Sequence, residues 1–380
     1  MTVTRTHDPA SRSRSSIVEF DVHGLAGIRL VDASPSDLAT VSAQIGPASV
    51  LSETPDLTIR FVEDLAPERP VNWIEPHSIG FSDEGLFLYA ADSGAGPTGC
   101  LRLEAPGPRW ELRCRTGQGS VPLLLPLVDL AVSAKGAFAL HASAFTYRGS
   151  GVAVAGFARS GKTTALLAFM TRGAAYIGDD RVYLQAEERR IYGLAQPLAL
   201  RATHLAELPG LARTVGRRGR SRLRLCQALE RTANMAARIE SVGDLARRVA
   251  GAAGDASVSV SPERIFSECP WQGRLDKAFL AFVHDSPDVR VEPVEPRHLA
   301  ERLVFSVRAE RLPLWRFYYA FRYAFPEQAE VFGEDAEDVE AERLANALEG
   351  TETYAFYHPY PAPVQAIHDA LVPVLGSTRC

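Results

Sequence analysis

Residues 152–163 read VAVAGFARSGKT, an apolar run that leads into a glycine-rich segment. Val152–Ala155 predict a buried strand, because small and β-branched apolar residues follow a glycine-containing turn. The next helical pattern runs from Thr163 to Arg172 and ends at Gly173. The segment between strand and helix fits GxxxxGK[ST], and a loop in this setting cradles phosphate groups.

The residue types in this loop suit a polyphosphate. Glycines near both ends let the backbone curl so that N–H groups point inward, and the helix N-terminus adds partial positive charge. Lys162 would reach the β- and γ-phosphates, and the Thr163 hydroxyl would bind Mg²⁺. Besides Lys162 the chain has only two lysines, Lys135 and Lys277, among many arginines. Because this chain uses arginine in place of lysine almost everywhere, a lysine in this loop is not explained by its general composition. The predicted nucleotide-binding residues are Gly156, Ala158, Arg159, Ser160, Gly161, Lys162, Thr163 and Thr164.

Two adjacent acids follow the next apolar run. Ala174–Gly178 predict a second buried strand, which ends at Asp179 and Asp180. A carboxylate at the end of a strand beside a phosphate loop can hold Mg²⁺ directly or through water. Adjacent side chains on a strand point in different directions, so one acid can face the metal and the other an incoming hydroxyl. The alternative is a turn that leads into the strand at 182–184.

His141 lies in the strand-like run Ala137–Tyr147, just before the loop strand. One interpretation is a hydrogen-bonded core residue. The other is a group near the phosphates or the acid pair that tunes their protonation.

The composition excludes several classes of protein. Hydrophobic residues make up 46% and charged residues 23%, which is typical of a folded protein. With a formal net charge of -5 there is no basic field over the whole chain, so we expect no nucleic-acid partner. The most apolar window, Val121–Val132, is too short and too interrupted by proline to span a membrane. Five scattered cysteines without a CxxC pair, and an N-terminus without an apolar signal segment, indicate a cytoplasmic protein.

The pattern along the chain predicts an α/β protein with a smaller β-rich N-terminal domain. Short β-rich segments separated by turn residues occupy the first third, and a helix is expected at Ser120–Ala134. A helical pair is expected at Arg297–Phe325. The Arg-rich stretch Arg213–Arg224 is either a solvated face or a surface that faces an anion. The expected divisions are a disordered tail at 1–16, the β-rich domain at 17–118, the phosphate-loop domain at 119–325, and an acidic segment with a C-terminal helical extension at 326–380.

Several of these segments together resemble a known family. The run His141-Ala-Ser143, the loop strand with its phosphate loop, Thr171-Arg-Gly173 and Gly178-Asp-Asp-Arg-Val182 are similar to the catalytic core of HPr kinase/phosphorylase and its relatives. Those relatives include kinases that phosphorylate a serine of a peptide natural-product precursor. The close resemblance covers Ala137 to about Arg201.

The resemblance implies a P-loop kinase domain related to HPr kinase and phosphoenolpyruvate carboxykinase. It implies Asp179 as the base or hydroxyl-positioning group and Asp180 as the Mg²⁺-side carboxylate, with their order open to exchange. It also implies that His141 lies nearby. The family's C-terminal signature, which contacts the HPr protein, is absent from this sequence, and the N-terminal domain has no counterpart. Regulation of sugar uptake is therefore not implied.

These observations lead to one functional hypothesis with two alternatives. We expect a kinase that uses ATP and Mg²⁺ to phosphorylate a hydroxyl, in the first place a serine of a peptide or small protein. Catalysis would depend on Lys162, Arg159, Asp179 and His141, with Thr163 and Asp180 at the metal. The alternatives are a kinase for a small-molecule alcohol and a nucleotide-sensing protein without transferase activity. The sequence leaves the oligomeric state open, with a homo-oligomer as one possibility.

Overall fold

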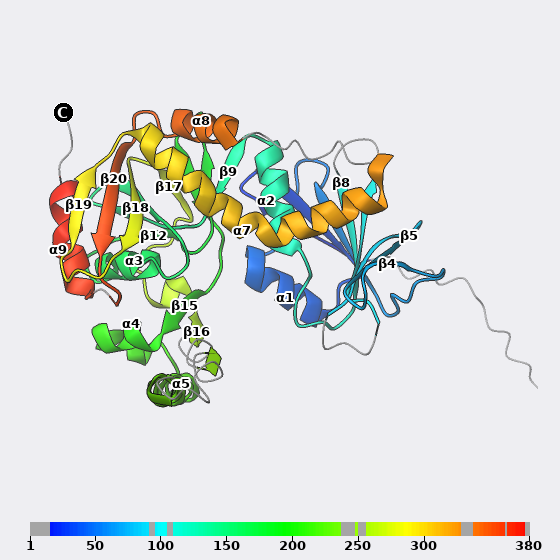
Figure 1. The fold of residues 1–380 in the computed structure, drawn as a ribbon, viewed down its shortest axis with the longest axis horizontal. Helices are drawn as coiled ribbons and strands as arrows, with labels where there is room; N and C mark the ends of the chain where they lie inside the picture. Colours follow the sequence, from blue (N-terminus) through cyan, green and yellow to red (C-terminus); the bar gives the residue numbers. More distant parts are fainter. Residues whose placement is uncertain are drawn as a thin grey trace, which may run out of the picture. The chain divides into compact units, whose positions relative to one another are not determined.

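The computed structural model describes residues 16–90, 96–104, 109–236, 248–249, 256–327, 337–361 and 363–376. The chain forms two compact units, and each is described by itself (Figure 1). The first unit comprises Met1–Ser42, Pro47–Ala131 and Phe317–Phe332, and the second comprises Ala43–Gly46, Val132–Arg316 and Gly333–Cys380. The expected disordered tail, except Ser16, and residues 328–336 of the acidic segment lie outside the described residues.

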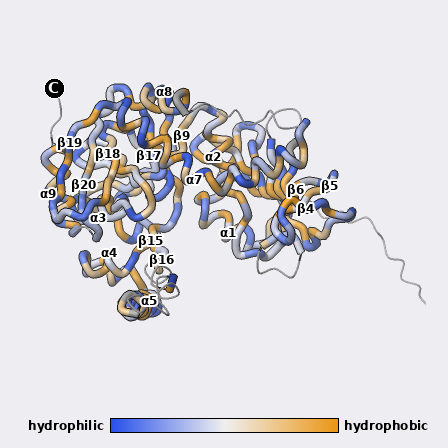
Figure 2. Tube along the Cα trace, in the orientation of Figure 1, coloured by the Kyte–Doolittle hydropathy of each residue, from blue (hydrophilic) through white to orange (hydrophobic). Residues whose placement is uncertain are grey.

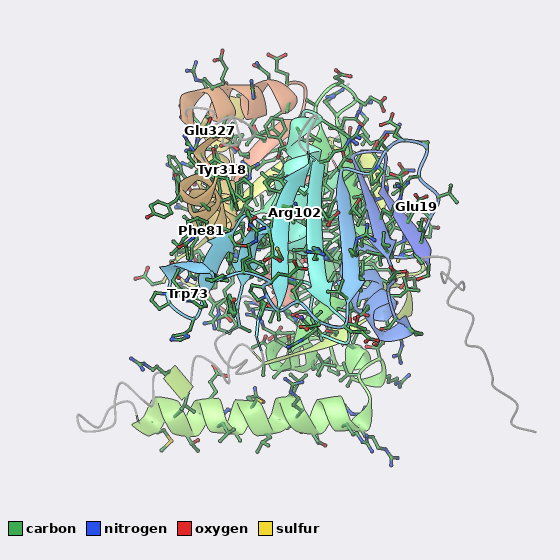
Figure 3. All side chains as sticks on the ribbon, turned by 90° about the vertical axis from the view of Figure 1, so that its right-hand side faces the viewer. Glu19, Trp73, Phe81, Arg102, Tyr318 and Glu327 are labelled. Atoms are coloured by element: carbon green, nitrogen blue, oxygen red, sulfur yellow. The ribbon has the colours of Figure 1, made fainter. Side chains whose placement is uncertain are left out.

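The first unit is built on a mixed sheet. In its described part the strand order is β1-β2-β3-β8-β7-β6-β5-β4, with β2/β3 and β3/β8 parallel and the other pairs antiparallel. The strands are β1 (Ile17–Val22), β2 (Ala26–Val31), β3 (Leu57–Val62), β4 (Asn72–Glu75), β5 (Ile79–Ser82), β6 (Gly85–Leu88), β7 (Gly99–Glu104) and β8 (Arg109–Arg115). Figure 3 shows these strands side by side, with exposed Arg102 on β7 labelled. Helices α1 (Pro35–Ile45) and α2 (Leu124–Ala134) begin in this unit, and α2 confirms the helix expected there.

The second unit is built on a six-stranded sheet, in the described residues, of order β12-β10-β11-β18-β20-β19. β18 is parallel to both of its neighbours, β11 and β20, whereas the other pairs are antiparallel. The strands are β10 (Ala142–Tyr147), β11 (Ser150–Ala155), β12 (Ala175–Gly178), β18 (Lys277–Val283), β19 (Arg290–Pro293) and β20 (Glu352–His358). The predicted order of strand, loop, helix and strand is confirmed as β11, the phosphate loop, α3 (Lys162–Met170) and β12. The C-terminal region, expected to be a helical extension, also supplies β20 to the middle of this sheet.

The two faces of this sheet carry side chains of different size. Phe145, Val154 and Phe279 pack with α3 and α9 (Val364–Leu375). Small residues such as Ala144 and Ala155 face the other way, toward α7 (Pro296–Ala324) and α8 (Glu337–Ala347). Successive residues of a strand alternate between faces, so the sequence of β10 and β11 encodes both surfaces at once. The alanine face lets α7 approach closely, which brings this helix beside the phosphate loop.

The remaining elements of the second unit form two smaller sheets and further helices. Within the described residues, a four-stranded antiparallel sheet contains β9 (Ala137–Leu140), β13 (Val182–Gln185), β14 (Arg190–Gly193) and β17 (Gln272–Arg274). Strand β15 (Leu198–Arg201) pairs with β16 (Ser257–Val260). The helices are α4 (Ala202–Glu207) and α5 (Arg217–Ala236), with 3₁₀ turns η1 (Pro209–Arg213) and η2 (Pro262–Arg264). The Arg-rich stretch lies mainly in α5, where Arg217, Arg218 and Arg222 are exposed. The run at 137–147, expected as one strand, is split between two sheets, and His141 is the residue at the break.

The expected helical pair is instead one continuous helix, α7. Its buried residues Leu299, Leu303, Val307 and Leu314 keep helical spacing without a glycine or polar turn to end the pattern. Figure 2 shows orange, hydrophobic stretches within both units. Of the helices in the described part of the chain, none combines the length and apolar character needed to cross a membrane. Together the elements make a mixed α/β protein, as the sequence predicted.

Candidate active site

The phosphate loop opens into a cavity of about 520 Å³ at the N-terminus of α3. Gly161 has a φ of 83° and Gly156 a φ of 152°, values that favour glycine. A Cβ at Gly161 would lie 2.6 Å from the ring of His358, and one at Gly156 would lie 2.5 Å from Ser160 Oγ. No side chain caps the N-terminus of α3. The loop therefore leaves backbone donors open to an anion, in a shape that only glycine permits at these two positions.

Lys162 is buried inside this loop, with 6% of its surface exposed. Its Nζ donates hydrogen bonds to the carbonyl oxygens of Gly156 at 2.9 Å and Phe157 at 2.7 Å. Burial lowers the pKa of Lys162 to about 8, although the nearby carboxylates oppose this shift. Ser160 Oγ is buried and has no hydrogen-bond partner in the described structure. A bound phosphate would satisfy this hydroxyl and stabilise the ammonium.

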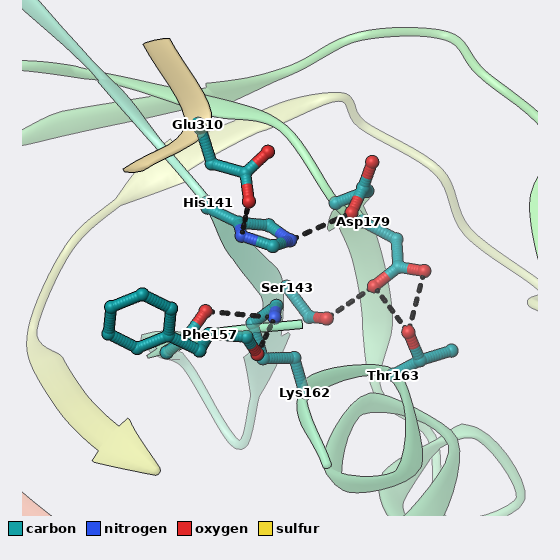
Figure 4. Close-up of polar contacts among 9 residues, drawn as sticks. His141, Ser143, Phe157, Lys162, Thr163, Asp179 and Glu310 are labelled. Atoms are coloured by element: carbon teal, nitrogen blue, oxygen red, sulfur yellow. Dashed lines mark hydrogen bonds and ion pairs between the residues drawn. The ribbon is translucent and has the colours of Figure 1, made fainter. Parts of the chain in front are cut away.

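Asp179 lies against the loop at the end of β12 (Figure 4). Its carboxylate accepts hydrogen bonds from Ser143 Oγ and from Thr163 Oγ1, which is 3.1 Å from Oδ1 and 3.0 Å from Oδ2. Burial raises the pKa of Asp179, while the hydrogen bond from Ser143 opposes the increase. A nearby cation would favour the ionised form of this buried acid.

The oxygen atoms of Thr163 and Asp179 fit Mg²⁺, which prefers hard oxygen ligands and usually keeps several waters. Among the described residues, no group of three or more His, Cys, Asp or Glu side chains could hold a metal ion. A cation at this pair would therefore take its other ligands from phosphate oxygens and water. The residues present suit a metal that binds together with a nucleotide.

Asp180 follows directly but has different surroundings. Its backbone φ is 68°, in the left-handed region, and its side chain is 78% exposed. His141 Nε2 lies 3.0 Å from Asp180 Oδ1, and His141 Nδ1 lies 2.8 Å from Glu310 Oε1 of α7. The hydrogen bond with His141 lowers the pKa of Asp180 and likewise lowers the pKa of Glu310.

His141 is held between these two carboxylates. Burial alone would lower its pKa, but the hydrogen bonds with Asp180 and Glu310 outweigh burial, and the pKa of His141 is raised. A protonated His141 can donate a hydrogen bond from Nε2 to Asp180 and form an ion pair with Glu310 at Nδ1. The arrangement therefore keeps Asp180 ionised, oriented and open to a hydroxyl.

Most of the predicted site residues come together in this one cavity. Ten of them line it: His141, Ala158, Arg159, Ser160, Gly161, Lys162, Thr163, Thr164, Asp179 and Asp180. Gly156 lines a neighbouring pocket and meets the site through the bond that its carbonyl accepts from Lys162. His141 is a buried, hydrogen-bonded residue, as the first interpretation of it expected, and its ring also lies beside the acid pair, as the second expected.

Four further residues contact this site that were not predicted from the sequence. Ser143 was visible in the motif around His141, but nothing indicated its bond with Asp179. Glu310, in α7, is far from the loop in sequence and gave no signal. His204 accepts a hydrogen bond from the Arg201 N–H at Nδ1, and its Nε2 lies 3.4 Å from Thr164 Oγ1. Burial lowers the pKa of His204 to about 4, so it is neutral at physiological pH.

The fourth missed residue, His358, holds the loop from the end of β20. The ring is 1% exposed, with Nε2 2.8 Å from the carbonyl oxygen of Ser160 and Nδ1 2.8 Å from that of Pro359. The Nε2 contact fixes the orientation of the Ser160–Gly161 peptide, whose N–H belongs to the loop. His358 therefore couples the end of a central strand to the phosphate loop.

The sequence matches no protein-family model and no curated protein.

Proposed function

We propose that this chain is a kinase that uses ATP and Mg²⁺ to phosphorylate a hydroxyl, with a serine of a peptide or small protein as acceptor. The observation that carries the proposal is the contact between Thr163 of the loop and Asp179, with exposed Asp180 next to it. A loop suited to phosphate then faces one acid suited to a cation and another that is open to a hydroxyl. A P-loop kinase fold similar to that of HPr kinase is part of the proposal, supported by the order of β11, loop, α3 and β12.

The surroundings of the two acids favour Asp179 at the metal and Asp180 at the acceptor hydroxyl. Asp179 is bonded to Thr163, so we assign it to the metal side, together with that hydroxyl. Asp180 is exposed and has a lowered pKa, so it can accept a proton from the acceptor hydroxyl at neutral pH. The resemblance to HPr kinases implied the opposite order and left the exchange open. Bound Mg²⁺ would neutralise charge on the phosphates and orient them.

The remaining residues position and neutralise the phosphates. Lys162, the loop amides and Arg159 surround the phosphate end of the cavity. The acceptor oxygen would form a bond to the γ-phosphorus, the bond from phosphorus to the ADP oxygen would break, and the acceptor proton would go to Asp180. His141 and Glu310 would keep the Asp180 carboxylate in place for this transfer. Such catalysis depends mostly on positioning and electrostatic stabilisation.

Nucleotide binding tests the proposal directly. We expect the protein to bind ATP in the presence of Mg²⁺ in a calorimetric titration, and Lys162→Ala to weaken binding by about 100-fold or more. Lys135→Ala is the matched control, because Lys135 is exposed and outside the cavity. Equal binding by the Lys162 variant and the control would contradict the assignment of the loop. Binding without any phosphorylated product from peptides or metabolites would favour the nucleotide-sensing alternative.

A further inference from the structure

A second pocket, of about 390 Å³, lies on another side of the phosphate loop. It is bounded by the start of the loop, by the end of β18 and by one stretch of α7. Its lining includes Phe157, Phe282, Val283, Arg302, Phe305 and Ser306. All of them belong to the second unit.

The wall of this pocket is apolar and in part solvent-exposed. Phe157 is 56% exposed, Phe305 50% and Val283 46%, although all three are large apolar side chains. The Arg302 guanidinium lies 5.5 Å from the centre of the Phe282 ring, which leaves its aliphatic part along the pocket. A concentration of exposed apolar side chains around one hollow is typical of a binding site.

The pocket also contains a buried polar group without a partner. Ser306 is 1% exposed, and its Oγ has no hydrogen bond within the described residues. A buried hydroxyl without a partner is unfavourable in an isolated protein. A ligand with a polar backbone beside an apolar side chain would supply the missing bond.

The position of α7 connects this pocket to the proposed acceptor side of the active site. Arg302, Ser306 and Glu310 recur at every fourth residue, so they lie along one face of the helix. Glu310 contacts His141, which contacts Asp180. At about 1.5 Å rise per residue, Ser306 and Arg302 lie roughly 6 and 12 Å along the axis from Glu310. An extended peptide covers about 3.3 Å per residue, so the pocket is roughly two to four peptide residues along α7 from Glu310, on the side of the site where Asp180 lies.

The nucleoside of bound ATP would lie in the larger cavity and not in the apolar pocket. The larger cavity contains the N-terminus of α3 and continues to His204, Tyr360 and Pro361. Phosphates seated at that N-terminus would direct the nucleoside into this cavity and leave the apolar pocket free. The apolar pocket meets the loop at Gly156–Ala158 and Ser160, away from Thr163 and Thr164.

We propose that the apolar pocket binds an apolar side chain of the acceptor peptide, a few residues from the serine that is phosphorylated. The proposal rests on the proposed kinase function and narrows its substrate class to peptides with such a side chain. The pocket thus supplies specificity, while Asp180 and the loop supply chemistry.

Blocked nine-residue peptides test the proposal. Each has a central serine with glycine elsewhere, and in each derivative one flanking glycine is replaced by phenylalanine, leucine or glutamate. We expect a phenylalanine or leucine within four residues of the serine, on one side of it, to raise kcat/KM roughly tenfold or more over the all-glycine peptide. Glutamate at the same position should give no such increase.

Variants of the pocket locate the effect. Phe305→Ala should remove most of the preference for the apolar peptide, and Phe305→Leu should retain it, because leucine rebuilds an apolar wall. Leu312→Ala is the matched control, since Leu312 is 65% exposed on the same helix and does not line the pocket. The ATP affinity of the Phe305 variants should equal that of the wild-type protein.

The outcomes separate the two proposals. Equal phosphorylation of all peptides would overturn the apolar subsite and leave the kinase proposal intact. A loss of ATP affinity in Phe305→Ala would also overturn the subsite, because it would place the nucleoside there. Absence of phosphorylation from every peptide, with the wild-type protein, would overturn both.

Discussion

The two adjacent acids of the site, Asp179 and Asp180, differ in nearly every physical respect. Asp179 is 8% exposed and bonded to Ser143 and Thr163, whereas the Asp180 side chain is 78% exposed and bonded to His141. The surroundings raise the pKa of Asp179, by burial, and lower that of Asp180, through the hydrogen bond with His141. Two identical residues with pKa values moved in opposite directions are suited to different tasks.

The comparison extends to the two sides of the site. The phosphate side is mostly local in sequence, because buried Lys162 and neighbouring Thr163 belong to one loop and helix start. The acceptor side is assembled from distant elements, with exposed Asp180 after β12, His141 between β9 and β10, and Glu310 on α7. We therefore expect substitutions on the phosphate side to affect nucleotide binding, and those on the acceptor side to affect transfer.

The largest expected effect comes from substituting the two acids one at a time. Asp180→Asn should reduce kcat by about 10²- to 10⁴-fold, because it removes the group that accepts the proton. Its affinity for ATP with Mg²⁺ should stay close to that of the wild-type protein. Asp179→Asn should instead weaken the dependence of ATP binding on Mg²⁺, measured by titrating the metal at fixed nucleotide.

The two variants are each other's control, since the substitution is the same and the positions are adjacent. The opposite result, with Asp180→Asn altering the metal response and Asp179→Asn altering transfer alone, would restore the order implied by the resemblance to HPr kinases. It would also mean that the contact between Thr163 and Asp179 does not persist with nucleotide bound.

Buried Lys162 predicts a pH dependence on the phosphate side. The charged ammonium binds phosphate, and because burial lowers its pKa to about 8, the charge is lost as the pH rises above that value. The affinity for a non-hydrolysable ATP analogue should therefore be constant below about pH 7.5 and fall by up to about tenfold per pH unit above 8. Lys162→Arg keeps its charge throughout this range, so its affinity, although weaker, should not change with pH. A constant affinity of the wild-type protein up to pH 9.5 would contradict the prediction.

His358 provides a smaller test of the phosphate side, at a residue remote in sequence. His358→Leu removes the contact with the Ser160 carbonyl, and we expect it to raise the KM for ATP by about tenfold or less, with a smaller effect on kcat. His358→Gln retains a donor and should recover part of the affinity. Thermal unfolding of both variants is the control. If the KM for ATP rises only in proportion to the loss of thermal stability, His358 has no specific role in holding the loop.

The sequence predicted the phosphate side of the site better than the acceptor side. The loop between Gly156 and Thr164 and the acid pair were found because each is a contiguous pattern with a local physical reason. The fold was predictable where periodicity is local, as in α2, β11 and α3. Which acid lies against Thr163 was not predictable, because it depends on the left-handed backbone at Asp180.

The rest of the site depends on contacts between distant parts of the chain. Glu310 lies in a helix expected as part of a pair, and it reaches His141 because the alanine face of the sheet admits α7 closely. His358 ends β20, a strand missed in a region expected to be helical. Parallel pairing of β18 with β20 depends on residues far apart in the sequence, so no local pattern marks it.

The smallest expected effect at neutral pH comes from substituting His141. The direction in which the pH dependence of kcat/KM shifts tests the acceptor side. The bond with His141 lowers the pKa of Asp180, so removing the ring should raise that pKa, and Asp180 should become protonated at a higher pH. Because the ionised form accepts the proton, kcat/KM of His141→Asn should begin to fall at a higher pH than in the wild-type protein as the solution is acidified. Relative to the wild-type protein, kcat/KM of His141→Asn should be lower by about fivefold or less at pH 7.5, and by more at acidic pH. His298→Asn, an exposed residue of α7, is the control. If kcat/KM of His141→Asn falls at the same pH as that of the wild-type protein, a group other than Asp180 causes the fall in acid. The bond to His141 would then no longer support different roles for Asp180 and Asp179.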